Sequence, residues 1–156
     1  KQLNMKLMKS IIVITLVFIT ITGKSQTATD STQIKQAALD YIEGWFYKDS
    51  IRVNKAVHFE FAKRSILTTH DNIDFLGTIN KSRMDYITLY HQERKYHLKT
   101  DVLILDAMPT IASVKAIFNE CIEYLHIAKL NGEWKIVNDL FTRNPDYEKK
   151  KVPPAT

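Results

Sequence analysis

The sequence predicts an α+β domain in which three helices precede a run of antiparallel strands and cover one face of the sheet. Three observations support this class. An apolar stripe at three- and four-residue spacing marks a helix near the start of the domain, residues 97–118 hold two strand-like runs, and residues 123–141 have the pattern of a β-hairpin. About 130 residues follow residue 25, a length that suits one domain with a single core.

The hairpin is the strongest local signal. Residues 123–141 read EYLHIAKLNGEWKIVNDLF, two runs rich in β-branched and aromatic residues around Asn131-Gly132. An Asn-Gly pair supplies the positive φ angles that a two-residue type I′ turn requires at both central positions. Two earlier strands are predicted at residues 97–105 and 111–118, separated by a turn at Met108-Pro109-Thr110.

The first helix is predicted to begin near Asp30 or Ser31, either of which can cap it, and to end at about Tyr47. Its apolar stripe consists of Ile34, Ala37, Ala38, Tyr41, Ile42 and Trp45. A second, shorter helix is expected after a cap at Asp49 or Ser50.

Residues 58–69, HFEFAKRSILTT, alternate unevenly between apolar and polar side chains. They predict a loop with short extended pieces. A third helix is expected from a cap at Asn80 or Ser82 to about His91, because apolar residues there recur on a common side.

A targeting segment precedes the domain. Residues 5–9 begin with methionine and carry two lysines, residues 10–22 form an uncharged apolar run, and Gly23 and Ser25 place small side chains before a cut at Gln26. We expect residues 1–25 to be a signal peptide, export to the periplasm or beyond, and no membrane attachment after its removal. The alternative is an uncleaved N-terminal anchor.

The charge balance excludes an extended nucleic-acid surface. The chain holds 22 Lys and Arg against 17 Asp and Glu, but residues 1–25 contain four of the lysines and no acid, which leaves 18 basic residues against 17 acidic ones. No basic cluster of the kind that binds nucleic acid stands out in the domain expected at 26–145. The remaining lysine run, Lys149–Lys151, falls in a flexible basic tail expected at 146–156.

The chain resembles the nuclear-transport-factor-2-like (NTF2-like) superfamily over residues 32–141, and within it the small exported bacterial proteins of the Putative lumazine-binding branch, relatives of SnoaL-like cyclases and ketosteroid isomerases. The stretches that carry the resemblance are YIEGWFYKD (41–49), AVHFEFAKRSI (56–66), DVLILDAMPTIASVKAIF (101–118) and YLHIAKLNGEWKIVNDLF (124–141). The resemblance implies a cone: a strongly curved antiparallel sheet wrapped around the long first helix, with two shorter helices. It also implies a pocket between sheet and helices, and a homodimer packed through the sheets.

Three polar residues are expected on one face of the hairpin. Counting back from a two-residue turn, Tyr124 faces Asp139 and His126 faces Val137, so His126 is diagonal to Asp139. A phenol, an imidazole and a carboxylate on one surface could bind a polar ring edge or exchange protons. The alternative is that this face is solvated or lies in a dimer interface.

Three further residues are candidates for the pocket. Tyr41 and Trp45 lie one helical turn apart, where they could stack on a flat ligand or belong to the core. The resemblance implies a place for His58 at the pocket mouth, with a structural role as the alternative. The sequence has no His pair with zinc spacing and no Gly-rich phosphate loop, so we expect neither a metal nor a cofactor.

Three functions remain open at this level. The first is a binding module for a small flat or apolar ligand, which we favour. The second is an isomerase- or cyclase-like enzyme that uses Asp139 or His126 as a base. The third is a dimeric accessory or assembly protein without pocket chemistry.

Overall fold

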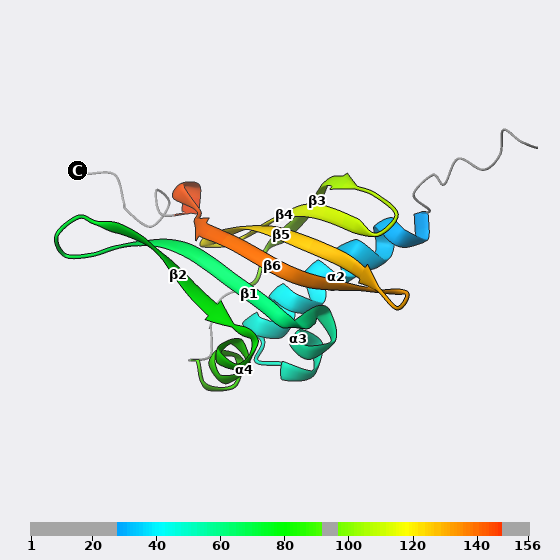
Figure 1. Ribbon diagram of the computed structural model, residues 1–156, viewed down its shortest axis with the longest axis horizontal. Coiled ribbons are helices and arrows are strands. Elements are labelled where there is room, and N and C mark those ends of the chain that lie inside the picture. Colours follow the sequence, from blue (N-terminus) through cyan, green and yellow to red (C-terminus); the bar gives the residue numbers. More distant parts are fainter. Residues whose placement is uncertain (1–27, 92–96, 148–156) are drawn as a thin grey trace, which may run out of the picture.

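The computed structural model describes residues 28–91 and 97–147 of the chain. The elements in these ranges, labelled as in Figure 1, are α2 (Ala28–Phe46), α3 (Ser50–Ala56), β1 (Val57–Thr68), β2 (Asp74–Asn80), α4 (Lys81–Tyr90), β3 (Thr100–Ala107), β4 (Ile111–Phe118), β5 (Cys121–Leu130) and β6 (Glu133–Arg143). Residues 145–147 add one helical turn. The expected signal peptide and all but the first two residues of the expected tail lie outside the described ranges, so both stay predictions.

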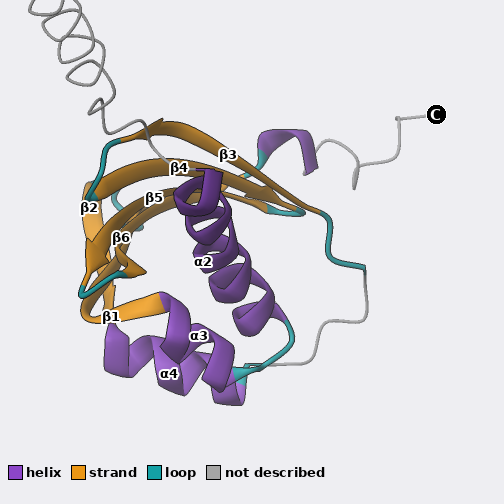
Figure 2. Ribbon diagram, turned by 90° about the vertical axis from the view of Figure 1, so that its right-hand side faces the viewer, coloured by secondary structure: helices purple, strands orange, loops and turns teal. Residues whose placement is uncertain are grey.

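The six strands form one sheet in the order β2-β1-β6-β5-β4-β3. Neighbouring strands are antiparallel except β1 and β6. These two are parallel, with pairs that run from Val57 opposite Ile136 to Arg64 opposite Leu140. Figure 2 shows the sheet curving around α2, with α3 and α4 below it. The α+β class and the curved sheet around the first helix are confirmed, and the expected all-antiparallel pairing is corrected at this one pair.

The three helices lie where their patterns predicted them, but the cap expected at Asp30 or Ser31 is wrong, because α2 already includes both residues. The buried side of α2 presents Ile34, Ala38 and Tyr41 to the sheet, each no more than 1% exposed. Asp49 caps α3 by accepting a hydrogen bond from the backbone N–H of Arg52. Asn80 caps α4 in the same way. Side-chain caps of this kind satisfy backbone donors that have no partner within the helix.

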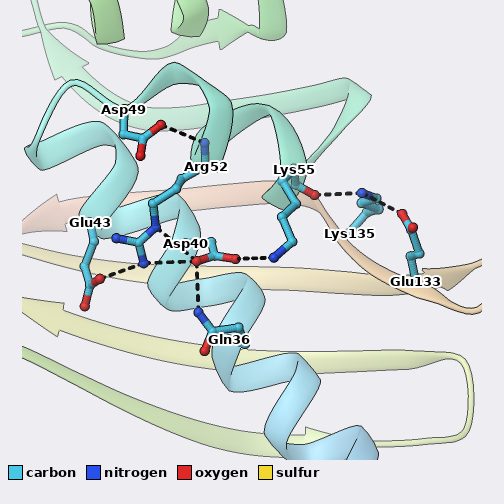
Figure 3. Close-up of polar contacts among 8 residues, drawn as sticks. All are labelled: Gln36, Asp40, Glu43, Asp49, Arg52, Lys55, Glu133 and Lys135. Carbon is cyan, nitrogen blue, oxygen red and sulfur yellow. Dashed lines mark hydrogen bonds and ion pairs between the residues drawn. The ribbon is translucent and has the colours of Figure 1, made fainter.

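A buried carboxylate fastens α3 to α2. Asp40 Oδ1 accepts hydrogen bonds from Gln36 Nε2 at 2.9 Å and from Arg52 Nε and Nη2 at 3.1 and 3.0 Å (Figure 3). Asp40 Oδ2 lies 3.3 Å from Lys55 Nζ, and Lys135 Nζ of β6 donates to the Lys55 carbonyl. Both oxygens of Asp40 therefore have partners, and the network joins two helices to β6 near the hairpin turn.

The expected loop at residues 58–69 is wrong. These residues lie in and just after the long strand β1, which pairs with β2 on one side and with β6 on the other. Phe61 points inward from β1 and packs edge-on against the Tyr41 ring, with the ring centroids 5.5 Å apart. Strand β2 was also absent from the prediction. Both strands depend on backbone pairing with each other or with residues far along the chain, which local alternation does not report.

The hairpin turn is confirmed, but the pairing beyond it shifts by one residue. Asn131 and Gly132 have φ angles of 51° and 86°, as a type I′ turn requires. Pairing follows the two-residue turn as far as Ile127 opposite Ile136, and then His126 lies opposite Asn138. Val137 is thus an extra residue, a β-bulge. A one-residue slip reverses which face a side chain occupies.

The apolar core lies between α2 and the concave face of the sheet. Its largest buried side chains include Tyr41, Phe61, Phe118, Leu125 and Ile136. Trp45 is partly buried against this core and contacts Phe118. Within the described ranges, no helix combines the length and the apolar run needed to cross a membrane.

Candidate functional site

Three charged side chains meet on the concave face because of how the strands pair. Lys63 of β1 lies directly opposite Asp139 of β6. Glu123 of β5 lies opposite Phe141, which follows Asp139 by two residues on β6. Directly paired side chains share a face, and diagonal neighbours are within reach of long side chains. The bulge at Val137 turns Asp139 inward, so both carboxylates can reach the ammonium group.

Lys63 is the centre of this cluster. Its Nζ atom donates to Asp139 Oδ2 at 2.7 Å, to the Tyr41 hydroxyl at 3.2 Å and to Glu123 Oε1. The Tyr41 hydroxyl in turn donates to Asp139 Oδ2 at 2.9 Å. The side chains of Glu123 and Asp139 are 2% and 0% exposed, and that of Lys63 is 12% exposed. The cluster is therefore an ion triad inside the domain, joined to α2 by Tyr41.

Two oxygen atoms of the triad have no partner among the described residues. They are Glu123 Oε2 and Asp139 Oδ1. An unpaired buried carboxylate oxygen is costly, because burial removes the water that would otherwise bind it. With Lys63 and both carboxylates ionised, the triad also carries one excess negative charge.

This environment shifts the pKa values of Glu123, Lys63 and Tyr41. Burial and the charge of Asp139 raise the pKa of Glu123 from its ordinary 4.5 to about 7, against the opposing effect of Lys63. Burial would lower the pKa of Lys63, but Glu123 and Asp139 raise it above its ordinary 10.5. Burial, reinforced by the same two carboxylates, raises the pKa of Tyr41 well above 10.0. Of these three groups, only Glu123 changes charge near neutral pH.

A cavity of about 140 Å³ adjoins the triad. It lies between the concave face and helices α2 and α4, and its lining residues are Trp45, Lys63, Ile79, Met84, Ile87, Cys121, Glu123 and Phe141. Most of these side chains are apolar, and Lys63 and Glu123 form its charged wall. Mostly apolar walls with a few placed polar groups are typical of small-molecule sites.

The structure brings three of the six predicted site residues to this region. Tyr41 and Asp139 belong to the triad's hydrogen-bond network, and Trp45 lines the cavity. Trp45 also stacks beside His91, with the ring centroids 5.4 Å apart. The prediction that Asp139 shares a surface with Tyr124 and His126 is wrong, because the bulge turns Asp139 inward.

The other three predicted residues lie elsewhere. Tyr124 and His126 are exposed on the outer face of the sheet, where the Tyr124 ring lies near Lys115 and His126 lies near Asn138. His58 stacks on Phe59 at the start of β1 and is not among the residues that line the cavity. No group of three or more His, Cys, Asp and Glu side chains suited to a metal occurs in the parts of the chain that the structure describes.

The sequence reading missed Lys63 and Glu123. Glu123 had a signal, because it shares alternate positions with Leu125 and Ile127, both buried, and is therefore a charged residue on an apolar strand face. Lys63 had a weaker sequence signal, because the pattern of residues 58–69 did not predict a strand.

We expect Lys63→Met to lower the free energy of unfolding by about 3–5 kcal/mol, because it leaves two buried carboxylates without their cation. Denaturant titration measures this change. Lys115→Met, on the outer face of β4, is the matched control and should cost less than about 1 kcal/mol. Adding Glu123→Gln and Asp139→Asn to Lys63→Met should recover part of the loss. Equal midpoints for Lys63→Met and the parent would contradict this account of the triad.

A second prediction concerns pH. The folded protein holds the Glu123 proton more tightly than the unfolded chain, so raising the pH from about 5 to about 8 releases that proton and lowers the free energy of unfolding. Glu123 should contribute a fall of roughly 1–3 kcal/mol over this range. Glu123→Gln should lack that contribution, so the difference between the two stability profiles isolates Glu123. Parallel stability profiles for the two proteins would disprove the role of Glu123.

Comparisons with known proteins place the chain in a family. A family model described as "Putative lumazine-binding" matches residues 29–142. None of the curated proteins compared matches the chain.

Several solved structures share its fold. An NTF2-like protein of unknown function from Shewanella baltica has a TM-score of 0.67 and 16% identity, covering 78% of this chain and 99% of that one. A protein of unknown function with a cystatin-like fold from Nostoc punctiforme has a TM-score of 0.59 and 13% identity, with coverages of 76% and 94%. A ketosteroid isomerase-like protein from Erwinia carotovora atroseptica has a TM-score of 0.52 and 12% identity, with coverages of 75% and 98%.

At these identities the structural likeness shows the fold alone. The family match spans most of the chain, and the curved sheet around α2 agrees with it. The protein therefore belongs to the Putative lumazine-binding family and has an NTF2-like fold.

Proposed function

We propose that this domain binds a small, flat and mostly apolar ligand in the cavity between the sheet and helices α2 and α4. The observation that carries the proposal is an apolar cavity that ends on a buried carboxylate with one unpartnered oxygen, Glu123 Oε2. A volume of about 140 Å³ suits a single ring, since a cavity of about 150 Å³ can hold benzene. The description of the family names lumazine, a flat heterocycle of two fused rings, so the name agrees with a flat ligand but denotes a molecule larger than the single ring that this cavity holds.

An acid–base enzyme is the second candidate. A carboxyl group with a pKa of about 7 that faces an apolar cavity is suited to general acid–base catalysis. In that case the base is Glu123, since His126 is on the outer face and Asp139 does not line the cavity. Stabilising a developing oxyanion needs a donor as well. Lys63, the cation in the cavity wall, already donates to three protein acceptors, and for this reason we favour binding.

The binding proposal predicts that filling the cavity abolishes ligand binding. Ile87 of α4 lines the cavity, so Ile87→Trp should remove the thermal shift produced by single-ring aromatic compounds that stabilise the parent. Ile111→Trp is the control, because Ile111 is 60% exposed on β4. Equal shifts in the parent and in Ile87→Trp would place the ligand outside the cavity.

We also propose that the protein forms a homodimer through the outer face of the sheet. Ile66, Leu76, Tyr124 and Leu140 are each at least 42% exposed and share this face by strand register. They border or lie near a groove of about 530 Å³. Apolar patches of this kind on a soluble domain commonly mark interfaces.

Leu140→Lys should therefore shift the protein towards the monomer in sedimentation-velocity experiments, because it places a charge within the apolar contact. Ile51→Lys, at an exposed position on α3, is the control and should leave the assembly unchanged. A parent protein that is monomeric at all concentrations tested would rule out the dimer.

A further inference from the structure

We propose that the cavity selects ligands whose buried end carries an N–H donor, most strongly a cationic one, and discriminates against ligands that end in a carboxylate. This inference rests on the proposed binding function and names the ligand class of the same site. It follows from which polar atoms of the triad are already engaged and which are left.

The lysine in the cavity wall does not make an anion site. An ammonium group has three N–H donors. Those of Lys63 are directed to Asp139 Oδ2, the Tyr41 hydroxyl and Glu123 Oε1, one each. A ligand carboxylate would have to displace one of these protein acceptors, which would leave a buried group without its partner.

The atom left for a ligand is an acceptor. Glu123 Oε2 is buried and has no partner among the described residues, and Glu123 lines the cavity. Asp139 Oδ1 is also unpartnered, but Asp139 is not part of the lining. An N–H group at the buried end of the ligand would satisfy Glu123 Oε2 directly. A positive charge on that group would also neutralise the excess negative charge of the triad, and charge-assisted hydrogen bonds are about twice as strong as neutral ones.

A carboxylate ligand meets the opposite conditions. It would bring a third negative charge beside Glu123 and Asp139, with one ammonium between them, in a site where little water screens the repulsion. It can be accommodated only if Glu123 takes up a proton and donates it. Cations and anions should therefore respond to pH in opposite directions.

The pH dependence of ligand binding has to be assigned to one of the groups that surround the cavity. Lys63 comes from β1, Asp139 from β6, Tyr41 from α2 and Cys121 from β5, while α4 contributes the apolar Met84 and Ile87 to the cavity. The His91 ring packs against the Trp45 ring, and His91 Nε2 is 2.6 Å from the Trp45 carbonyl oxygen. The raised pKa values of Lys63 and Tyr41 keep those two groups from titrating near neutrality. A variant at Glu123 separates its contribution from those of the remaining groups.

Benzamidine, benzamide and benzoate test the proposal, because they share one ring and a planar end group but differ in charge. Isothermal titration calorimetry with the full chain at about pH 8 should give a benzamidine dissociation constant at least about tenfold lower than that of benzoate, with benzamide between them. From about pH 6 to about pH 8, benzamidine should bind more tightly and benzoate more weakly. Ile87→Trp should abolish binding of all three.

Two variants assign the preference to Glu123. Glu123→Gln should weaken benzamidine binding by about tenfold, to the level of benzamide, and remove most of its pH dependence. Asp139→Asn also removes a carboxylate from Lys63 but lies outside the cavity lining, so it should still bind benzamidine more tightly than benzoate. If Glu123→Gln does not fold, the opposite pH responses of the two probes in the parent protein decide the question.

The outcomes separate the inference from the function on which it rests. Equal affinity for benzamidine and benzoate, with binding lost in Ile87→Trp, would overturn the inference and leave the binding function in place. Tighter binding of benzoate than of benzamidine would overturn it as well. If none of the three probes binds, both the inference and the proposed function fail.

Discussion

The ammonium group of Lys63 is the constraint on which the inner face of this sheet depends. Glu123 and Asp139 occupy inward positions on neighbouring strands, and each would be a buried, uncompensated charge without it. Two topological features place the cation there. The parallel pairing of β1 with β6 sets Lys63 opposite Asp139, and the bulge at Val137 turns Asp139 inward. The charge cluster is thus a consequence of strand register.

The parts of the fold that the sequence predicted correctly are those that local signals specify. The apolar stripe of α2, the caps Asp49 and Asn80, and the Asn131-Gly132 turn each depend on residues within one or two turns of the chain. Strand β1 could not be predicted in this way, because its parallel partner lies more than seventy residues further along the sequence. The overall curved sheet came from the family resemblance.

In the candidate site, too, residues specified by local spacing were predicted and residues placed by long-range strand pairing were not. Tyr41 and Trp45 were found because helical spacing alone places them towards the sheet. The grouping of Asp139 with Tyr124 and His126 failed because one extra residue, invisible in the alternation of β6, reverses every inward and outward assignment beyond it. Glu123 was detectable in principle as an acidic residue in phase with Leu125 and Ile127. A charge at a core-facing strand position requires a partner of opposite charge, and for Glu123 that partner is Lys63.

The contrast between the two buried polar networks indicates which one serves a ligand. Around Asp40 both carboxylate oxygens have partners, and the network has a structural role because it joins α2 to α3. Around Lys63 two oxygens are unpartnered, and one negative charge is in excess when both carboxylates are ionised. Apolar side chains of similar volume often stabilise a core as well as or better than a buried ion cluster does, so stability alone does not explain an incomplete one. An N–H donor entering the adjoining cavity would complete the hydrogen bonding of Glu123, which gives this part of the cluster a role that stability alone does not.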